Sequence, residues 1–127
     1  MKKCISLGVL ICLFLSCRNT VEHPEYGKDI APLIYRSCSP CHRPKQIGHF
    51  NLLTYEEVKS NAQKIKYTIT HHLMPPWPAD PTYSHFVGEN ILHDEEIDCI
   101  VRWIDQGCRR GDSQAIPPVR IFPPDLF

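Results

Sequence analysis

Two cysteines and a histidine stand close together in the pentapeptide CSPCH at residues 38–42. Two residues separate Cys38 from Cys41, and His42 follows the second cysteine directly. Thiols and imidazoles at this spacing can bind zinc, form a redox-active disulfide or attach a c-type haem. The rest of the sequence decides among these three chemistries.

The surrounding sequence favours haem attachment. A thioredoxin-like redox pair expects a βαβ context, which the helical pattern of this chain does not offer. A zinc site needs two more ligands at suitable spacing, and no second CxxC motif is present. On a helical turn that runs into a loop, two thiols three residues apart can reach the two vinyl groups on one porphyrin edge. We therefore predict one covalent haem c, with thioether bonds from Cys38 and Cys41 and with His42 as the proximal iron ligand.

The iron of an electron carrier needs a second axial ligand, for which Met74 is the candidate. It is the only methionine after the initiator residue. A thioether favours ferrous iron and raises the reduction potential. Three prolines in the segment MPPWP at 74–78 stiffen the chain, so the sulfur loses little conformational entropy on binding. His71 and His72, immediately upstream, are the competing ligands, and either would give bis-histidine ligation with a lower potential.

Hydrophobic periodicity predicts three helices, whereas no segment alternates over more than a few residues as a strand would. The helices are expected at about 29–38, 54–74 and 94–106, with long irregular connections at 43–53 and 75–92. Loops of that length in a small domain usually wrap a ligand or a functional site. The predicted fold class is therefore all-α, with three main helices and long loops around one haem.

The ends of these helices carry their own signals. Asp29 is expected as the N-cap of the first helix. Thr54 and Glu57 form a capping box at the start of the second helix. That helix is expected to carry Leu73 on its apolar face and to end at the prolines that begin with Pro75, because proline cannot donate to the helical ladder.

The N-terminus predicts export. Residues 1–16 combine a positively charged start with an apolar run that is too short for a transmembrane helix, which needs about 17–25 residues. The run ends in LFLSC, which resembles a lipoprotein lipobox with Cys17 as the lipidated residue. We predict a protein on the periplasmic side of the inner or outer membrane, anchored through a lipid on Cys17. Plain secretion and an uncleaved interfacial anchor are the alternatives.

Charge and cysteine counts exclude other classes of protein. The chain has 14 basic and 14 acidic residues, a balance that gives no support to nucleic-acid binding. Three of the seven cysteines lie in the N-terminal segment and two in the pentapeptide, so the chain is not a disulfide framework. The remaining pair, Cys99 and Cys108, is too far apart to bond within one helix, and we expect free thiols.

Several segments together resemble a class I-like cytochrome c module of exported bacterial proteins. They are YGKDIAP at 26–32 before the pentapeptide, LTYEE at 53–57, MPPWPAD at 74–80, and DEEI at 94–97 with WIDQG at 103–107. The resemblance implies a small cytochrome c-like fold wrapped around the haem. It also implies thioethers at Cys38 and Cys41 and axial ligation by His42 and Met74.

The resemblance covers roughly residues 26–112, and it suggests how the chain is organised. We expect a signal peptide at 1–16, a lipidated tether at 17–27, a cytochrome c domain at 28–112 and a proline-rich tail at 113–127. A domain of this size buries little apolar core, so the haem-free protein is expected to be largely unfolded.

The expected function is electron transfer rather than catalysis, because a coordinated Met74 blocks the sixth iron position. The partners would be redox proteins or a membrane oxidoreductase complex. One alternative is a peroxidase-like haem enzyme with an accessible sixth site. Another is a haem subunit that docks permanently on a redox enzyme through its proline-rich tail.

Overall fold

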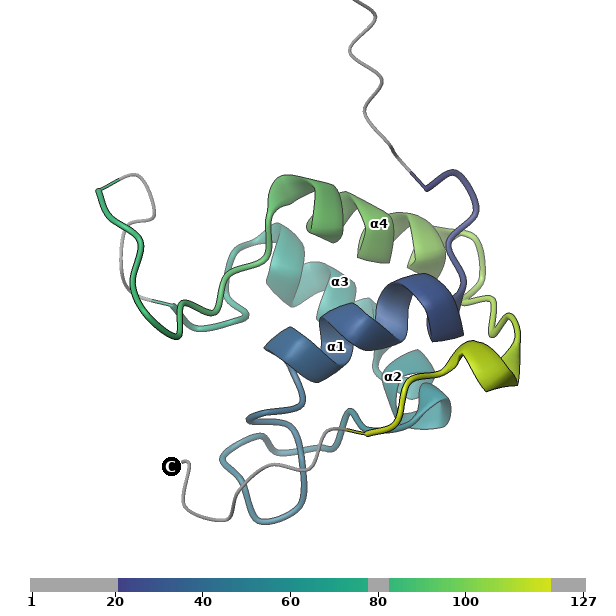
Figure 1. Ribbon diagram of the computed structural model, residues 1–127, viewed down its shortest axis with the longest axis horizontal. Coiled ribbons are helices and arrows are strands. Elements are labelled where there is room, and N and C mark those ends of the chain that lie inside the picture. The colour runs from purple at the N-terminus through teal and green to yellow at the C-terminus, as the bar shows by residue number, and fades with distance from the viewer. Residues whose placement is uncertain (1–20, 78–82, 120–127) are drawn as a thin grey trace, which may run out of the picture.

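The structure is a computed structural model that describes residues 21–77 and 83–119 (Figure 1). The predicted signal peptide at 1–16, the lipidation site Cys17 and residues 78–80 of the MPPWPAD segment lie outside the described residues, as does the end of the tail. Within the described ranges the chain forms helices and no strand, which confirms the all-α prediction. None of these helices is both long enough and apolar enough to cross a membrane.

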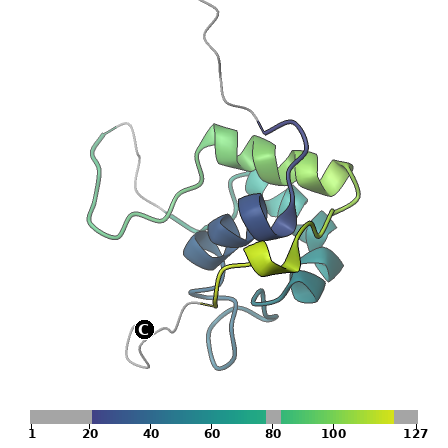
Figure 2. The ribbon, with the colours of Figure 1, turned by 45° about the vertical axis from the view of Figure 1, so that its right-hand side comes forward.

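Four α-helices are preceded and followed by single short helical turns. In chain order they are η1 (Tyr26–Ile30, a π-helical turn), α1 (Ala31–Ser37), α2 (Tyr55–Ser60), α3 (Ala62–Thr70), α4 (Asp94–Asp105) and η2 (Ser113–Ala115, a 3-10 turn). α3 packs against α4, and η1 packs against α4 and η2. Figures 1 and 2 show α4 along one side of the molecule and the loop between α1 and α2 on the opposite side.

The first helix begins earlier than predicted. Asp29 is not its N-cap, because η1 runs directly into α1 and the helical segment starts at Tyr26. The Asp29 carboxylate instead accepts the backbone N–H of Glu25 at 2.9 Å. Asp29 therefore satisfies a free donor at the start of the segment from a position inside it.

The predicted second helix is divided into α2 and α3. Its capping box is confirmed, since Thr54 accepts the N–H of Glu57 and the Glu57 carboxylate accepts the N–H of Thr54. The helix is interrupted at Asn61, whose side-chain amide donates to the carbonyl of Glu57 at 2.9 Å. An amide that binds the carbonyl four residues back competes with the helical ladder, which explains the break.

The end of α3 also differs from the prediction. α3 ends at Thr70, before the prolines, and Leu73 is exposed rather than buried. The chain reverses at His72, whose φ is +52°, and the N–H of Leu73 bonds to the carbonyl of Thr68 at 2.8 Å. This is the hydrogen-bond pattern of a Schellman C-cap, so a turn and not Pro75 ends the helix.

The start of α4 is capped by an acidic side chain. The Glu96 carboxylate accepts the backbone N–H of His93 at 3.0 Å and the guanidinium of Arg36 at 2.9 Å. Burial alone would raise the pKa of Glu96, but these donors outweigh it and hold the pKa below its usual value. The bond to Arg36 also links α1 to α4.

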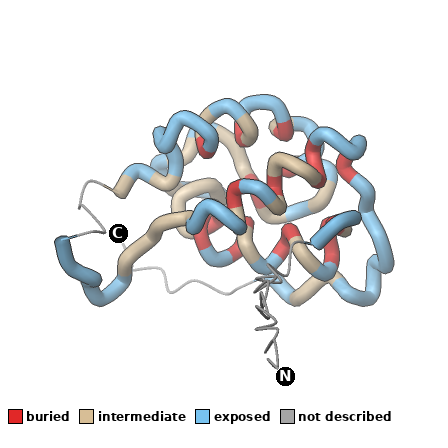
Figure 3. The backbone as a smooth tube through the Cα atoms, turned by 90° about the horizontal axis from the view of Figure 1, so that it is seen from above, coloured by how far each residue is buried: buried red, intermediate tan, exposed pale blue. Residues whose placement is uncertain are grey.

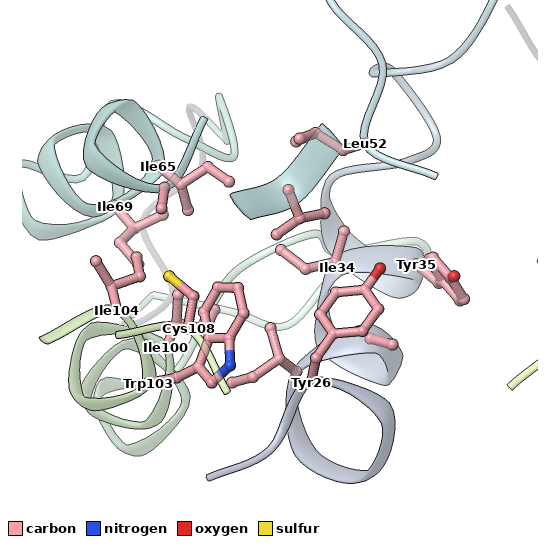
Figure 4. Packing of buried hydrophobic residues seen from close by; sticks show 14 of the residues in the cluster. Tyr26, Ile34, Tyr35, Leu52, Ile65, Ile69, Ile100, Trp103, Ile104 and Cys108 are labelled. Atoms are coloured by element: carbon pink, nitrogen blue, oxygen red, sulfur yellow. The ribbon is translucent and has the colours of Figure 1, made fainter. Parts of the chain in front are cut away.

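The core lies where η1, α1, α3 and α4 meet. Figure 3 shows that the buried positions gather on the faces that these helices turn toward one another. Trp103 is fully buried, and its ring centroid lies 5.9 Å from that of Tyr26, beside which Figure 4 shows it. Trp103 of α4 therefore packs on the first helical segment. Ile100 and Ile104 of α4 lie on the same side as Ile69 of α3 in Figure 4.

Residues 108–116 return along η1 and complete the core. The indole N–H of Trp103 donates to the carbonyl of Arg109 at 2.8 Å. A Cβ at Gly27 would lie 2.8 Å from the carbonyl oxygen of Asp112, closer than real Cβ contacts, so glycine is needed for this approach. The described start of the predicted tail is also part of the folded unit, because η2 packs on η1 and Ile116 packs against the core.

The described part of the predicted tether, residues 21–27, is also held on the fold. Arg102 donates to the carbonyl of Val21 at 3.0 Å, and Gln106 donates to the carbonyl of Glu22 at 2.9 Å. Tyr26 is fully buried, which raises its pKa well above the ordinary value. Residues 21 and 22 are therefore held along the C-terminal part of α4.

Thr54→Ala is expected to lower the free energy of unfolding by about 1 kcal/mol, because it removes the N-cap acceptor of α2. Thr70→Ala is the matched control, since the exposed Thr70 hydroxyl bonds to carbonyls of its own helix and to Nδ1 of the adjacent His71 and caps no helix N-terminus, and alanine is the better helix former. Urea unfolding of both variants checks this. Equal losses would show that the capping box contributes nothing of its own.

Candidate cofactor site

A cavity of about 680 Å³ lies between the turn at residues 38–42 and α3. Its walls are that turn, the loop that follows it, α3 and the segment just beyond α3. The lining residues are Ser37, Cys38, Cys41, His42, Ile47, Gly48, His49, Phe50, Leu52, Gln63, Lys64, Ile65, Tyr67, Thr68, Ile69, Met74, Pro75, Pro76 and Asn90. Most are apolar, and no Asp or Glu occurs among these described residues.

The four residues predicted to hold a cofactor all line this cavity. Cys38, Cys41 and His42 come from the turn after α1, whereas Met74 comes from the segment after α3. The fold thus brings together two parts of the chain that α2 and α3 separate in sequence. The volume lies within the range of about 300–1,000 Å³ that is usual for ligand pockets.

The turn that carries the two cysteines continues the path of α1. Cys38 is the C-cap of α1, and its N–H bonds to the carbonyl of Ile34 at 2.8 Å. The N–H groups of Cys41 and His42 both bond to the carbonyl of Cys38, at 3.2 and 2.9 Å. Residues three apart on such a turn share a side, so both thiols reach the same cavity.

Ser39, between the cysteines, holds the turn against the loop. It is fully buried, and its hydroxyl donates to the carbonyl of Leu52 at 2.6 Å. The N–H of Leu52 in turn donates to the carbonyl of His42 at 2.9 Å. Sequence reasoning gave Ser39 no role, because a serine in a CxxC spacer carries no signal of a partner thirteen residues away.

The imidazole of His42 has one nitrogen fixed by the backbone. Nδ1 lies 3.1 Å from the carbonyl oxygen of Phe50, and the centroids of the His42 and Phe50 rings are 4.6 Å apart. A carbonyl can only accept, so Nδ1 carries the proton of this bond and Nε2 of a neutral ring keeps its lone pair. This arrangement presents His42 as a ligand through Nε2.

Glycine at position 48 lets the loop approach His42. The N–H of Gly48 donates to the carbonyl of Cys41 at 2.9 Å. A Cβ on this residue would lie 2.7 Å from Nδ1 of His42 and 2.6 Å from the oxygen of Cys41. Any larger residue would therefore displace the ring, its backbone or the loop.

The thiol of Cys38 differs from that of a redox-active cysteine. Burial raises the pKa of its thiol to about 12, against a smaller opposing effect of Arg36. Nucleophilic and metal-binding cysteines act as thiolates and have lowered pKa values. A thiol whose pKa is raised by burial does not support the disulfide-exchange interpretation of the CxxC motif.

The polypeptide before and after Met74 is constrained by hydrogen bonds. The N–H of Met74 bonds to the carbonyl of Thr68 at 3.3 Å, and the N–H of Trp77 bonds to the carbonyl of Pro75 at 2.9 Å. The side chain of Met74 is 40% exposed, so it stands at the edge of the cavity rather than in the core.

The competing histidines do not line the cavity that contains the two cysteines. Nδ1 of His71 lies 2.7 Å from the carbonyl oxygen of Tyr67, and the ring of His71 stacks on the Tyr67 ring at 4.2 Å. His72 lines a second cavity, of about 520 Å³, which shares Met74 with the first. Of the three candidate ligands, Met74 is therefore the one that lines the same cavity as His42.

Two further polar groups, from Asn90 and Trp77, lie at or beside the site. Asn90 donates to the carbonyl of Ser37 at 3.1 Å and so ties the loop before α4 to the turn after α1. The indole nitrogen of Trp77 is buried without a hydrogen-bond partner in the described part of the chain, and Trp77 lines the second cavity. This free donor fits a cofactor that extends a hydrogen-bond acceptor past Met74.

The remaining cysteines and the comparisons add no other site. Cys99 and Cys108 are free thiols, as expected, and Cys108 is buried. No group of three or more His, Cys, Asp or Glu side chains that could hold a metal ion occurs among the described residues. Comparison of the chain with protein-family models, curated proteins and solved structures finds no match.

Gly48→Ala is expected to lower the free energy of unfolding by about 1–3 kcal/mol, the usual cost of overpacking, and to shift the ring resonances of His42. Urea unfolding and proton NMR measure these two effects. Gly88→Ala is the control, because a Cβ there meets no atom within 4 Å and only its positive φ is strained. Unchanged His42 resonances in Gly48→Ala would contradict the described contact.

Proposed function

We propose that the protein is a mono-haem c-type cytochrome that carries single electrons. In this proposal Cys38 and Cys41 would form the thioether bonds, and His42 and Met74 would ligate the iron. The observation that carries the proposal is that these four residues, from two separate segments, line one largely apolar cavity. When bound, the haem would supply the one-electron Fe(III)/Fe(II) couple.

The donor set fits a haem better than it fits a bare metal ion. A haem iron takes only two protein ligands, one from each side, so it does not require a cluster of three or more ligating side chains. Apolar side chains of α3 and of the loop offer the flat ring a surface that excludes water. The unpaired indole N–H of Trp77 offers a donor to a propionate.

Contacts with its neighbours orient His42. The Phe50 carbonyl holds the Nδ1 proton, which fixes the tautomer and the ring plane and increases the basicity of Nε2. The hydrogen bonds of Gly48 to Cys41 and of Leu52 to His42 hold the backbone on both sides of the ring. The chain itself therefore supplies the proximal ligand in a fixed direction.

The thioether of Met74 supports electron transfer over catalysis. A soft sulfur ligand stabilises the ferrous state and occupies the position where oxygen or peroxide would bind. Among the described residues that line the cavity, none is a carboxylate and one, Lys64 of α3, is a cation. We propose redox proteins or a membrane oxidoreductase complex as partners, reached from the periplasmic side by a protein anchored at Cys17.

A haem enzyme with an accessible sixth site is the second candidate. The observation that favours it is the 40% exposure of Met74, which places the ligand at the edge of the cavity. An exposed ligand can be displaced by peroxide or oxygen. The two candidates differ in whether Met74 stays bound at rest.

Protein produced with haem c maturation is expected to show, in the ferric state, the absorption band of sulfur-to-iron charge transfer. Met74→Leu should abolish this band and let the ferrous protein bind carbon monoxide. Tyr83→Phe is a control that should keep the band, because Tyr83 is exposed and lines neither cavity. A wild-type spectrum of the bis-imidazole type would assign the ligand to a histidine, and ready carbon monoxide binding by the wild type would favour the enzyme.

Loss of both attachment cysteines is expected to unfold much of the protein, because the cofactor would complete a small core. Cys38→Ala/Cys41→Ala should show a large loss of helical circular dichroism and no cooperative thermal transition. Cys99→Ala, outside the cavity, should leave both signals close to those of the wild type. A folded, cooperative double variant would contradict this expectation.

A further inference from the structure

The turn after α3 depends on one residue in a left-handed conformation. His72 has φ of +52°, and its N–H bonds to the carbonyl of Ile69 at 3.1 Å. The next N–H, of Leu73, bonds to the carbonyl of Thr68 at 2.8 Å. These two bonds and the positive φ between them define a Schellman motif with His72 at its C′ position.

This turn decides where Met74 lies. The N–H of Met74 bonds to the same Thr68 carbonyl at 3.3 Å, so the chain has folded back onto the last turn of α3. Thr68 and Met74 both line the cavity that contains Cys38 and Cys41. If the helix continued past Thr70, each residue would carry the chain about 1.5 Å further along the α3 axis and away from this reversal.

The side chain of His72 does not take part in this arrangement. It is exposed, and it lines the second cavity rather than the one with the cysteines. Positive φ is uncommon for residues other than glycine, although histidine adopts it more readily than most, and a β-branched residue there is strained. The backbone conformation at position 72 is therefore the feature that the site uses.

We infer that His72 is a positioning residue that holds Met74 at the cavity through its left-handed backbone and not through its imidazole. This inference rests on the proposed ligation of iron by Met74. From the other side, Pro75 and Pro76 restrict the chain directly after the ligand. The backbone of Met74 is thus fixed on one side by the turn at His72 and on the other side by two prolines whose φ is restricted.

Competition by exogenous imidazole tests this inference on the haem-loaded ferric protein. Imidazole displaces the sulfur ligand, and loss of the charge-transfer band reports the apparent affinity. His72→Val should bind imidazole roughly tenfold more tightly than the wild type, because strain at position 72 lets the Met74 segment open. His72→Gly should keep the band and bind imidazole no more tightly than the wild type, because glycine adopts positive φ freely.

Two controls separate this effect from general destabilisation and from loss of an imidazole. His71→Val changes the neighbouring histidine, whose φ is −99°, and should leave imidazole affinity within about twofold of the wild type. Ile100→Val weakens the core and should lower the unfolding free energy without changing imidazole affinity.

The outcomes are distinguishable. Wild-type affinity in His72→Val, or loss of the band in His72→Gly, would overturn the role of His72 while leaving Met74 as the ligand. A wild-type ferric protein without the band would overturn the proposed ligation itself, and the role of His72 with it.

Discussion

The site depends on the return of the loop at residues 43–53 onto the turn that carries the two cysteines. The buried Ser39 hydroxyl binds the Leu52 carbonyl, and the Leu52 N–H binds the carbonyl of His42. Between these contacts the Phe50 carbonyl holds Nδ1 of the histidine ring. The same hydroxyl lies 3.3 Å from the carbonyl oxygen of Ile34, so Ser39 joins α1 to the loop where the loop forms one wall of the cavity.

The cavity is an extension of the hydrophobic core. Leu52, Ile65 and Ile69 belong to the buried cluster and also line the cavity. α3 therefore has one apolar surface that serves both the contact with α4 and the wall of the site. A flat apolar group in the cavity would continue the packing that Trp103 and Tyr26 begin on the far side of the core. If the cavity holds the proposed haem, binding and folding would be coupled.

Local chemistry explains which features could be predicted from the sequence. The CxxCH spacing, the lone Met74 and the capping box at Thr54 each have a physical reason that involves only neighbouring residues. In the structure, the CxxCH residues and Met74 line one cavity, and the capping box is formed. The all-α class followed from apolar periodicity, because α3 and α4 each bury one face in the core. These features needed no knowledge of how distant segments meet.

The features that the sequence did not reveal are set by long-range contacts or by backbone geometry. The partner of Ser39 is known only once the loop has folded back. The left-handed conformation of His72 carries no sequence signal, because glycine is the residue usually expected there. The break at Asn61 and the early start of the first helix follow from side-chain bonds to the backbone, which hydrophobic periodicity does not detect.

The central claim, that the cavity beside Cys38 and Cys41 holds a covalently attached haem, is tested most directly by mass spectrometry. Protein produced with haem c maturation should have an intact mass increased by one haem under denaturing conditions. Proteolysis should place that increase on the peptide that contains residues 38–42. An unmodified mass, with any haem removed by acidified organic solvent, would contradict the account.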